Sequence, residues 1–321
     1  MEKETQPASF RTTIGGQALI EGILMRGPEK QSIVVRRPDG GLEIKTEELK
    51  LIKERYPVLG LPFIRGCVTF LDSMYKGVKA LMYSADFYPE EEAAQPGKFE
   101  VWLEKRLGSE AFSKVIVGLS VVLGICFSVG LFFLLPTVLT NLLSYLIPMS
   151  KLAVRLIEGV IRIAIFLSYL ILVSKMKDIR RVFSYHGAEH KTIFCYERGL
   201  ALTVDNVRDM PRHHPRCGTS FLFVVVAVAI LVHAALFSFV TPSNVFVRML
   251  LQLATLPVIV GISYEFNRFV GGHDNAVTRL LSAPGLWMQN FTTFEPDDSM
   301  MEVAIEALKQ VLPSQKGQDQ W

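Results

Sequence analysis

The sequence predicts a mainly α-helical membrane protein: a four-span transmembrane helical bundle with a small N-terminal β-hairpin region and cytoplasmic helices. Half of the 321 residues are apolar and the mean hydropathy is positive, which is high for a soluble protein. Four apolar stretches are long enough to cross a bilayer. They occupy about residues 113–136, 152–174, 221–240 and 245–263. A pair of short alternating segments lies well upstream of them, near the N-terminus.

Residues 1–56 are predicted to be a β-rich cytoplasmic region. Ser32–Arg37 has the composition of a strand, Pro38–Gly41 is a turn signal, and Leu42–Lys45 alternates as a return strand. A glycine-punctuated segment, Gly15–Pro28, precedes this hairpin, and its glycine pair is more typical of a structural turn than of a phosphate-binding loop. The opening MEKETQPASF lacks the basic and then apolar pattern of a secretory signal.

Residues 57–112 are predicted to form an amphipathic helical region. The pattern from Leu59 to Phe87 has a helical period, but Arg65, Asp72 and Lys76 interrupt its apolar surface. These charges make the segment unsuitable for spanning a bilayer. We therefore expect a helix that lies on the membrane or on the bundle.

Residues 113–264 are predicted to form the membrane domain. Its first span, Ser113–Pro136, reaches roughly 36 Å at about 1.5 Å per residue, which is enough to cross a hydrocarbon core. The following segment, Thr137–Ser150, is predicted to be a short apolar loop that is in part re-entrant.

The second span carries three charges on one helical face, because Arg155, Glu158 and Arg162 are three and four residues apart. Glu158 can therefore pair with both arginines. Charges at membrane depth are costly and normally face a bundle interior or a water-filled cavity. Two interpretations remain open: a polar cavity or substrate path, and a structural ion-pair clasp between helices.

Residues 265–321 are predicted to be a cytoplasmic C-terminal region. A loop is expected from Pro284 to Asp298, followed by an amphipathic helix at about Ser299–Val311 with acidic residues near its N-terminus. The last residues, Pro313–Trp321, are predicted to be a disordered tail.

Basic residues set the predicted orientation. Nine of them lie between residues 175 and 218: Lys175, Lys177, Arg180, Arg181, Lys191, Arg198, Arg208, Arg212 and Arg216. The opposite loops hold almost none, so the positive-inside rule places both termini and the loop 175–220 in the cytoplasm. The lipid bilayer is then a partner, whereas a net charge of +3 is too small to indicate nucleic-acid binding. Four cysteines without a CxxC pair fit a reducing compartment.

Potential metal ligands crowd into this cytoplasmic loop. It contains four of the six histidines and two of the four cysteines: His186, His190, His213, His214, Cys195 and Cys217. Residues 186–190 read H-x-x-E-H, which on a helix puts His186 and His190 one turn apart on one face, with Glu189 beside them. This order is the signature of inverted zincins, in which two histidines bind a metal and the glutamate takes a proton from metal-activated water. Gly187 costs about 1 kcal/mol relative to alanine in a helix, so we expect close packing there.

Two features could complete the ligand shell, and they imply different proteins. His214 and Cys217 form an H-x-x-C pair that begins 24 residues after His190, and Glu265 lies 75 residues after His190. Four ligands, with His214 and Cys217 both bound, make a closed structural site. Three ligands, with Glu265 or Cys217 as the third, leave a position open for water, and Glu189 can then act as general base.

Glu189 separates these cases, because a structural site has no need of an acid at that position. Its plainer alternative is a salt bridge to Lys191 or Arg181. Several basic residues nearby could hold an anionic substrate oxygen or a lipid headgroup, although for most of them a role in topology alone is the stronger expectation.

Six segments resemble the YqhQ-like bacterial membrane proteins, a family of unknown function, and the resemblance covers nearly all of the chain. The segments are GGQALIEGILMRGP (15–28), IEGVIR (157–162), RVFSYHGAEHKT (181–192), HPRCGTSF (214–221), GISYE (261–265) and TTFEPDD (292–298). The resemblance implies a multispanning inner-membrane protein that depends on a metal, and it implies no reaction. The family block includes His214 and Cys217, but its residue at the position of His213 is usually aromatic, so His213 is left out of the site. Similarity to zinc peptidases is confined to H-x-x-E-H and one distant glutamate.

Two functional hypotheses follow. In the first, the protein is a metal-dependent hydrolase at the cytoplasmic membrane face, with Glu189 as general base and a membrane-proximal peptide or an anionic lipid-like molecule as substrate. Its ligands for zinc or another divalent metal come from five side chains: His186, His190, His214, Cys217 and Glu265. In the second, the protein is a non-catalytic transporter or scaffold with a structural zinc site. A third case, in which the histidines bind no metal, would leave both hypotheses without a site.

Overall fold

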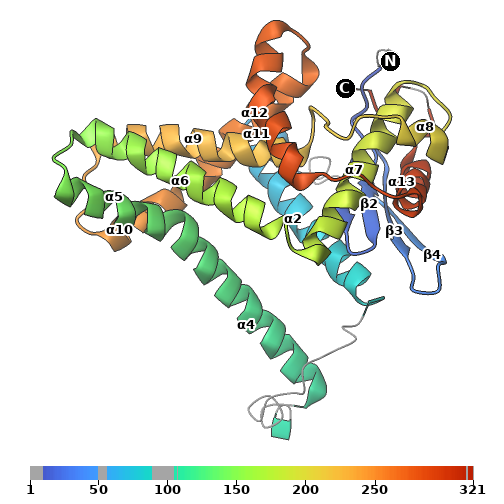
Figure 1. Ribbon diagram of the computed structural model, residues 1–321, viewed down its shortest axis with the longest axis horizontal. Coiled ribbons are helices and arrows are strands. Elements are labelled where there is room, and N and C mark those ends of the chain that lie inside the picture. Colours follow the sequence, from blue (N-terminus) through green and yellow to red (C-terminus); the bar gives the residue numbers. More distant parts are fainter. Residues whose placement is uncertain (1–9, 50–55, 89–104, 107, 316, 321) are drawn as a thin grey trace. The chain divides into compact units, whose positions relative to one another are not determined.

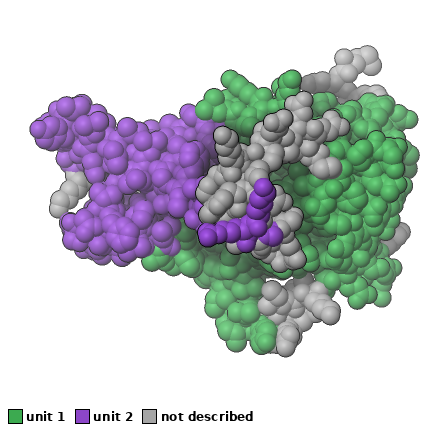
Figure 2. Space-filling view, turned by 90° about the horizontal axis from the view of Figure 1, so that it is seen from below, with its two compact units in different colours: residues 1–88, 170–232, 254–321 green, residues 89–169, 233–253 purple. Residues whose placement is uncertain are grey.

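The computed structural model describes residues 10–49, 56–88, 105–106, 108–315 and 317–320. The chain divides into two compact units, which Figure 2 shows in different colours. Unit 1 comprises residues 1–88, 170–232 and 254–321, and unit 2 comprises residues 89–169 and 233–253. Each unit is therefore assembled from segments that are far apart in the sequence.

Unit 1 contains a four-stranded antiparallel sheet in the order β1-β2-β3-β4 (Figure 1). Its strands are β1 (Gly15–Leu19), β2 (Gly22–Arg26), β3 (Lys30–Arg36) and β4 (Leu42–Glu48). The predicted hairpin is confirmed as β3 and β4, joined by a turn in which Gly40 has a φ of +85°. The glycine-punctuated segment before it, for which no strands are predicted, contributes β1 and β2.

Helices cover both faces of this sheet. The helices of unit 1 include η1 (Pro57–Gly60), α2 (Ile64–Ala85), α7 (Lys177–Glu197), α8 (Val204–Arg208), α12 (Ala276–Thr292) and α13 (Asp298–Val311). Because successive residues of a strand point to opposite faces, Ile23 and Val34 pack with α7 and α13. Leu24 and Ile33 pack on the other face with Ala80 of α2. Burial on both sides explains why β2 and β3 are apolar without a clear alternation.

Helix α13 confirms the helix predicted at residues 299–311. Asp297 caps its N-terminus by accepting a hydrogen bond from Met300 N at 3.0 Å. Its apolar face is buried in the core of unit 1 with α7 and the sheet, and Met301 and Leu308 are among the largest fully buried side chains.

The predicted disordered tail is wrong for residues 317–320. Asp319 is buried, and its carboxylate accepts hydrogen bonds from Thr12 Oγ1 at 2.6 Å and from the Tyr196 hydroxyl at 3.1 Å. A buried carboxylate is stable only with such partners, and these three groups tie the C-terminal residues to the N-terminal ones.

The apolar helices confirm a helical protein with several candidate spans. They are α4 (Ser109–Val129), the π-helical η2 (Gly130–Leu134), α5 (Leu135–Leu146), α6 (Lys151–Val173), α9 (Gly218–Phe239), α10 (Val245–Ala254) and α11 (Leu256–Gly272). Within the described residues three helices are long and apolar enough to cross a membrane: Gly118–Leu146, Ala153–Val173 and Gly218–Phe239. The pair α10 and α11, bent by 40°, makes a fourth if it is taken as one span.

Two details of these spans differ from the predictions. The loop expected at residues 137–150 is largely the helix α5, which continues from η2 and makes Gly118–Leu146 one long helix. The fourth predicted span, 245–263, is interrupted at Thr255, and its two helices pass together as one bent candidate span. Pro257 lies in the first turn of α11, and it cannot donate the hydrogen bond that would join the two helices.

The charges of the second span form a clasp within unit 2. Glu158 Oε1 accepts hydrogen bonds from Arg162 Nη2 at 3.1 Å and from Thr137 Oγ1 at 3.0 Å. The other carboxylate oxygen pairs with Arg248 of α10. Arg155 does not pair with Glu158 as predicted, because its guanidinium donates to Ser238 Oγ at 2.6 Å. Glu158 therefore forms the ion pairs of the structural interpretation, but its second partner is Arg248 and not Arg155.

Helix α2 confirms the amphipathic helix predicted within residues 59–87. Its buried face carries small residues, and a Cβ at Gly66 would lie 2.7 Å from Tyr264 Cβ. The glycine thus lets α2 approach α11 closely. The opposite face exposes a stripe of large apolar side chains: Leu71, Met74, Tyr75, Val78 and Met82.

The loop predicted from Pro284 to Asp298 is wrong in its first half. Helix α12 runs through Pro284 to Thr292, and only the residues that follow it are extended. A capping box starts the helix, because Thr278 N donates to Asn275 Oδ1 at 2.9 Å and Thr278 Oγ1 accepts from Asn275 N at 3.0 Å.

Candidate metal centre

Helix α7 presents the H-x-x-E-H motif. It confirms the helix predicted around residues 185–198 and begins earlier, at Lys177. The left-handed Gly199, with a φ of +67°, follows its end as predicted. The rings of His186 and His190 lie one turn apart with their centroids separated by 4.4 Å.

A third potential ligand joins the two histidines. His186 Nε2 lies 3.1 Å from Cys217 Sγ, just before α9 begins. One ligand atom from each of His186, His190 and Cys217 lies within 4.8 Å of the other two, so the group could hold a metal ion. His190 is buried, whereas His186 and Cys217 are partly buried.

Backbone carbonyls orient both imidazoles. His186 Nδ1 lies 2.8 Å from the Thr292 carbonyl oxygen, and His190 Nδ1 lies 2.6 Å from that of Arg212. A carbonyl oxygen only accepts hydrogen bonds, so each Nδ1 must carry the proton and donate it. In the neutral form of each ring, Nε2 then carries the lone pair, which is the arrangement found in histidines that bind metals.

The charges within the group favour a thiolate. Burial alone would raise the pKa of Cys217, but His186 and His190 lower it well below its ordinary value. Burial alone would lower the pKa of His186, but its neighbours, chiefly the Cys217 thiolate, together raise it to about 9. A thiolate is the form of cysteine that binds metals.

Glu189 lies beside this group with one oxygen held and the other unbound. Its Oε1 accepts a hydrogen bond from Gly16 N at 2.8 Å. Its Oε2 is buried and has no hydrogen-bond partner among the described residues. Burial raises the pKa of Glu189, and the nearby His186 and His190 oppose this only in part.

The salt bridges considered as alternatives for Glu189 are not formed. The buried Lys191 pairs with Glu295 and donates to the Arg208 carbonyl at 3.0 Å. Arg181 pairs instead with Glu21, in the turn between β1 and β2. Neither Lys191 nor Arg181 therefore neutralises Glu189.

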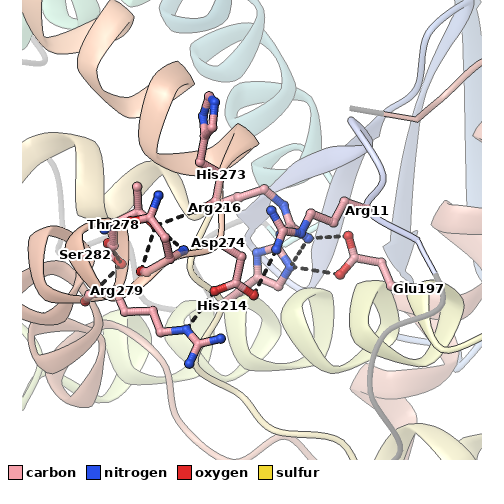
Figure 3. Close-up of polar contacts among 10 residues, drawn as sticks. Arg11, Glu197, His214, Arg216, His273, Asp274, Thr278, Arg279 and Ser282 are labelled. Atoms are coloured by element: carbon pink, nitrogen blue, oxygen red, sulfur yellow. Dashed lines mark hydrogen bonds and ion pairs between the residues drawn. The ribbon is translucent and has the colours of Figure 1, made fainter.

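His214 belongs to a neighbouring polar network. Its Nε2 lies 3.7 Å from Glu197 Oε2 and 3.3 Å from Arg216 Nη2, and Figure 3 shows both side chains turned toward Glu197. Burial lowers the pKa of His214 to about 4, so its ring is neutral. The ring stands 5.5 Å from that of His190 between centroids, but His214 is not part of the three-residue group.

Glu265 is not brought to this group. Its carboxylate forms a two-point ion pair with Arg65 of α2, with Arg65 Nε 2.7 Å from Glu265 Oε1. The sequence predicts that Glu265 lies at the cytoplasmic end of its span. In the structure the Glu265 carboxylate pairs with the Arg65 guanidinium, so Glu265 is not among the proposed ligands.

Three residues that support the centre escape the sequence analysis. Gly16 supplies the N–H that holds Glu189, and a Cβ there would lie 3.1 Å from the Glu189 carboxyl carbon. Gln289 of α12 accepts from His214 N and donates to His214 O, both at 2.8 Å. Thr292 holds His186 through its carbonyl. Gly16 and Thr292 lie in segments that carry the family resemblance, and nothing else in the sequence indicates that they support the centre.

Gly187 confirms the expected close packing, and a variant tests it. A Cβ there would lie 2.1 Å from the carbonyl oxygen of Phe294, a backbone atom. Gly187→Ala gains about 1 kcal/mol in helix propensity, but such overpacking costs about 1–3 kcal/mol or more. We expect a lower free energy of unfolding in detergent and weaker metal binding, because Phe294 must move near the carbonyl that holds His186. Gly124→Ala, with nothing within 4 Å, is the control. Equal stability of the two variants would contradict the contact.

Gln289→Leu is expected to loosen the loop before Cys217. The change leaves the buried N–H of His214 without its partner, at about 1–3 kcal/mol. It also removes one of the two hydrogen bonds to the His214 carbonyl, which keeps the one from Cys217 N at 3.3 Å. Amide hydrogen exchange of residues 211–217 should accelerate, and metal affinity should fall by about 10–100-fold, as for other losses of supporting hydrogen bonds around a metal. Asn290→Leu, at the exposed neighbouring position, should change neither. Unchanged exchange in the Gln289 variant would contradict this role.

Comparisons with known proteins agree on one family. The model of DUF1385, described as a protein of unknown function, matches residues 61–314. The uncharacterized protein YqhQ of Bacillus subtilis (strain 168) is 33% identical over 319 residues, which cover 97% of this chain and 95% of that protein. No solved structure matches the chain.

Proposed function

The chain belongs to the DUF1385 family of proteins of unknown function, and we propose that it is a metal-dependent hydrolase embedded in the inner membrane. The proposed metal ligands are His186, His190 and Cys217, and Glu189 is the proposed general base. The substrate is a membrane-proximal peptide or an anionic lipid-like molecule at the cytoplasmic face.

One observation carries this proposal: a buried carboxylate oxygen without a partner lies beside three potential metal ligands. In a structural site, an unpaired Glu189 Oε2 would only destabilise the fold, by about 1–3 kcal/mol or more. In a hydrolytic site, the same oxygen is the acceptor for the proton of the attacking water. A catalytic role for Glu189 therefore explains the unpaired Oε2, and a purely structural site does not.

The three side chains fit a zinc ion. Imidazole nitrogens and a thiolate are the ligands that zinc prefers, and the carbonyls behind both histidines fix the tautomer that binding needs. Three protein ligands leave a fourth position open, as in catalytic zinc sites. When bound, the zinc supplies Lewis acidity that acidifies the attacking water and polarises the bond to be cleaved.

The chain's own residues supply the proton transfers. Gly16 N holds Glu189 Oε1, so the carboxylate is fixed with Oε2 directed away from that bond. Burial raises the pKa of Glu189, which makes the carboxylate a stronger base. Glu189 takes the proton from water at Oε2 and returns it to the leaving group, so the residue ends in its starting state.

The apolar helices support a position at the membrane. With the bent pair counted as one span, the described chain has four candidate spans. The basic residues between Lys175 and Gly218 then favour a cytoplasmic centre, with both termini on the same side.

A structural zinc in a transporter or scaffold is the second candidate. It is favoured by one observation, the His214 ring 5.5 Å from that of His190, which is close enough for a small movement to add a fourth ligand. In that case Glu189 would have no chemical role.

Metal removal tests the hydrolase directly. The purified full-length protein, stripped with a chelator and then reloaded with zinc, is assayed by mass spectrometry on fluorogenic peptides and on phospholipid vesicles. We expect cleavage that is lost on chelation and restored by zinc. Zinc that raises the unfolding temperature without cleavage in any arm would instead indicate the structural site.

A further inference from the structure

Helix α12 has an inner face that builds the metal centre. Its buried residues are Thr278, Gly285, Met288, Gln289 and Thr292. Two of them act on the centre, because Gln289 fixes the backbone of His214 and the Thr292 carbonyl holds His186. A Cβ at Gly285 would lie 2.6 Å from Ser220, so α12 also packs tightly on the start of α9. The position of α12 therefore determines the geometry of the centre.

The exposed side of α12 carries an apolar stripe beside its buried face. Leu280 is 74% exposed, Val277 63%, Trp287 50% and Leu281 40%. At about 100° per residue, these four side chains fall within roughly one third of the helix circumference. A contiguous apolar surface next to a functional centre marks an interaction site.

A polar flank borders this stripe. Arg279 and Asn290 are exposed and lie together on the side of α12 away from its buried face. The Arg279 guanidinium donates to Asp274 Oδ1 at 2.7 Å, as Figure 3 shows. Trp287, at the edge of the stripe, packs edge-on against Phe291. An apolar stripe, a polar flank and a tryptophan at the edge are typical of helices at the membrane interface.

The chain itself indicates that a bilayer covers this stripe. Helix α11 packs against α12 and belongs to the bent candidate span, and only residues 273–275 separate the two helices. Helix α12 thus begins where an apolar helix ends, and a membrane that holds α11 is within reach of α12 at all times. Helix α2 packs against the same helix α11 and exposes a stripe of the same kind.

We propose that α12 lies in the headgroup region of the bilayer on its outer face, and that the centre on its inner face acts on a membrane lipid. A helix is about 10–12 Å thick with its side chains, so the centre lies within about one helix diameter of the lipid. The cleaved ester or phosphoester bond is then near the headgroup, and hydrolysis adds one water across it without another reactant. The substrate class rests on the proposed hydrolase, whereas the placement of α12 does not.

Fluorescence of Trp287 tests the placement. Of the three tryptophans, Trp102 and Trp321 are replaced by phenylalanine in the full-length protein, which is then reconstituted in vesicles of phosphatidylethanolamine and phosphatidylglycerol. We expect strong quenching by lipids brominated near the headgroup, weaker quenching by lipids brominated near the chain end, and little by aqueous iodide. Quenching by iodide without quenching by either lipid would overturn the proposal.

A tryptophan on the sheet is the control. Ile44 of β4 is 42% exposed, so Ile44→Trp in a chain with Trp287→Phe places a comparable side chain on unit 1 away from α12. Iodide should quench this tryptophan and brominated lipid should not. If brominated lipid quenches both tryptophans equally, the signal is unspecific and the placement of α12 is rejected.

A second measurement tests the substrate class. Zinc-loaded protein is incubated with vesicles that contain phosphatidylglycerol and cardiolipin and, separately, with a library of water-soluble peptides. Lipid products that fall by about 100-fold or more with Glu189→Gln support the inference. Glu189-dependent cleavage of peptides alone overturns the lipid substrate and leaves the hydrolase intact. Cleavage in neither arm contradicts the hydrolase and the lipid substrate together, and the fluorescence result still decides the placement of α12.

Discussion

Exchanging Glu189 for glutamine is expected to lower hydrolysis by about 10²–10⁴-fold without loss of metal. Glutamine has the same shape, and its carbonyl oxygen can still accept the hydrogen bond from Gly16 N. Its amide cannot take a proton from water, so the chemical step loses its base. Elemental analysis and the zinc-dependent cleavage assay, run on the same preparation, separate the two effects.

The matched control is the same exchange at an acid outside the centre. Glu295 pairs with Lys191 and is mostly exposed, so Glu295→Gln should keep both metal and activity. Full activity in Glu189→Gln would remove the general base from the mechanism and favour the structural zinc site. Loss of metal in that variant would mean that Glu189 is a ligand rather than a base.

Replacing His186 and His190 by alanine should take the metal content from about one ion per chain to almost none. The change removes two of the three potential ligands. Loss of a single supporting hydrogen bond around a metal already weakens binding by about 10–100-fold, so the loss of two ligands should exceed that. Inductively coupled plasma mass spectrometry of protein purified with and without added zinc measures the result.

Two alanine variants show whether the effect is specific. The His273 ring is exposed and donates a hydrogen bond to the Phe269 carbonyl oxygen, so His273→Ala should keep its metal. Glu265→Ala should also keep it, because Glu265 pairs with Arg65 and is not one of the clustered ligands. Metal content that is the same in all variants would end both the catalytic and the structural proposals.

Much of the local structure could be predicted from the sequence because local patterns encode it. The period of apolar residues predicts α2, α6, α9 and α13, and the positions observed agree within a few residues at most ends. The spacing of His186, Glu189 and His190 predicts their common helical face. The turn signal at residues 38–41 predicts the β3–β4 hairpin. Each of these patterns lies within one segment, so no knowledge of distant contacts is needed.

At two prolines the observed helices differ from the predicted ones. Pro284 suggests a loop, yet α12 continues through it, because the buried residues around it keep the helix packed on unit 1. Pro257 lies within a stretch that is apolar enough to span continuously, yet the helix breaks just before it. A proline always removes one backbone hydrogen bond from a helix. Packing around the helix determines whether the helix continues despite that loss.

The sequence by itself determined most of the helices, the β3–β4 hairpin and the paired histidines, because each follows from residue types a few positions apart. Only the tertiary structure decided which distant groups meet: Cys217 joins the histidines, His214 turns to Glu197, Arg65 takes Glu265, and Gly16 holds Glu189. Several candidate metal ligands lie at suitable distances along the sequence, and these distances do not show which of them reaches the two histidines. Competition among charged and hydrogen-bonding partners in the folded chain ranks them, since each buried polar group must be satisfied by whichever neighbour packing brings within reach.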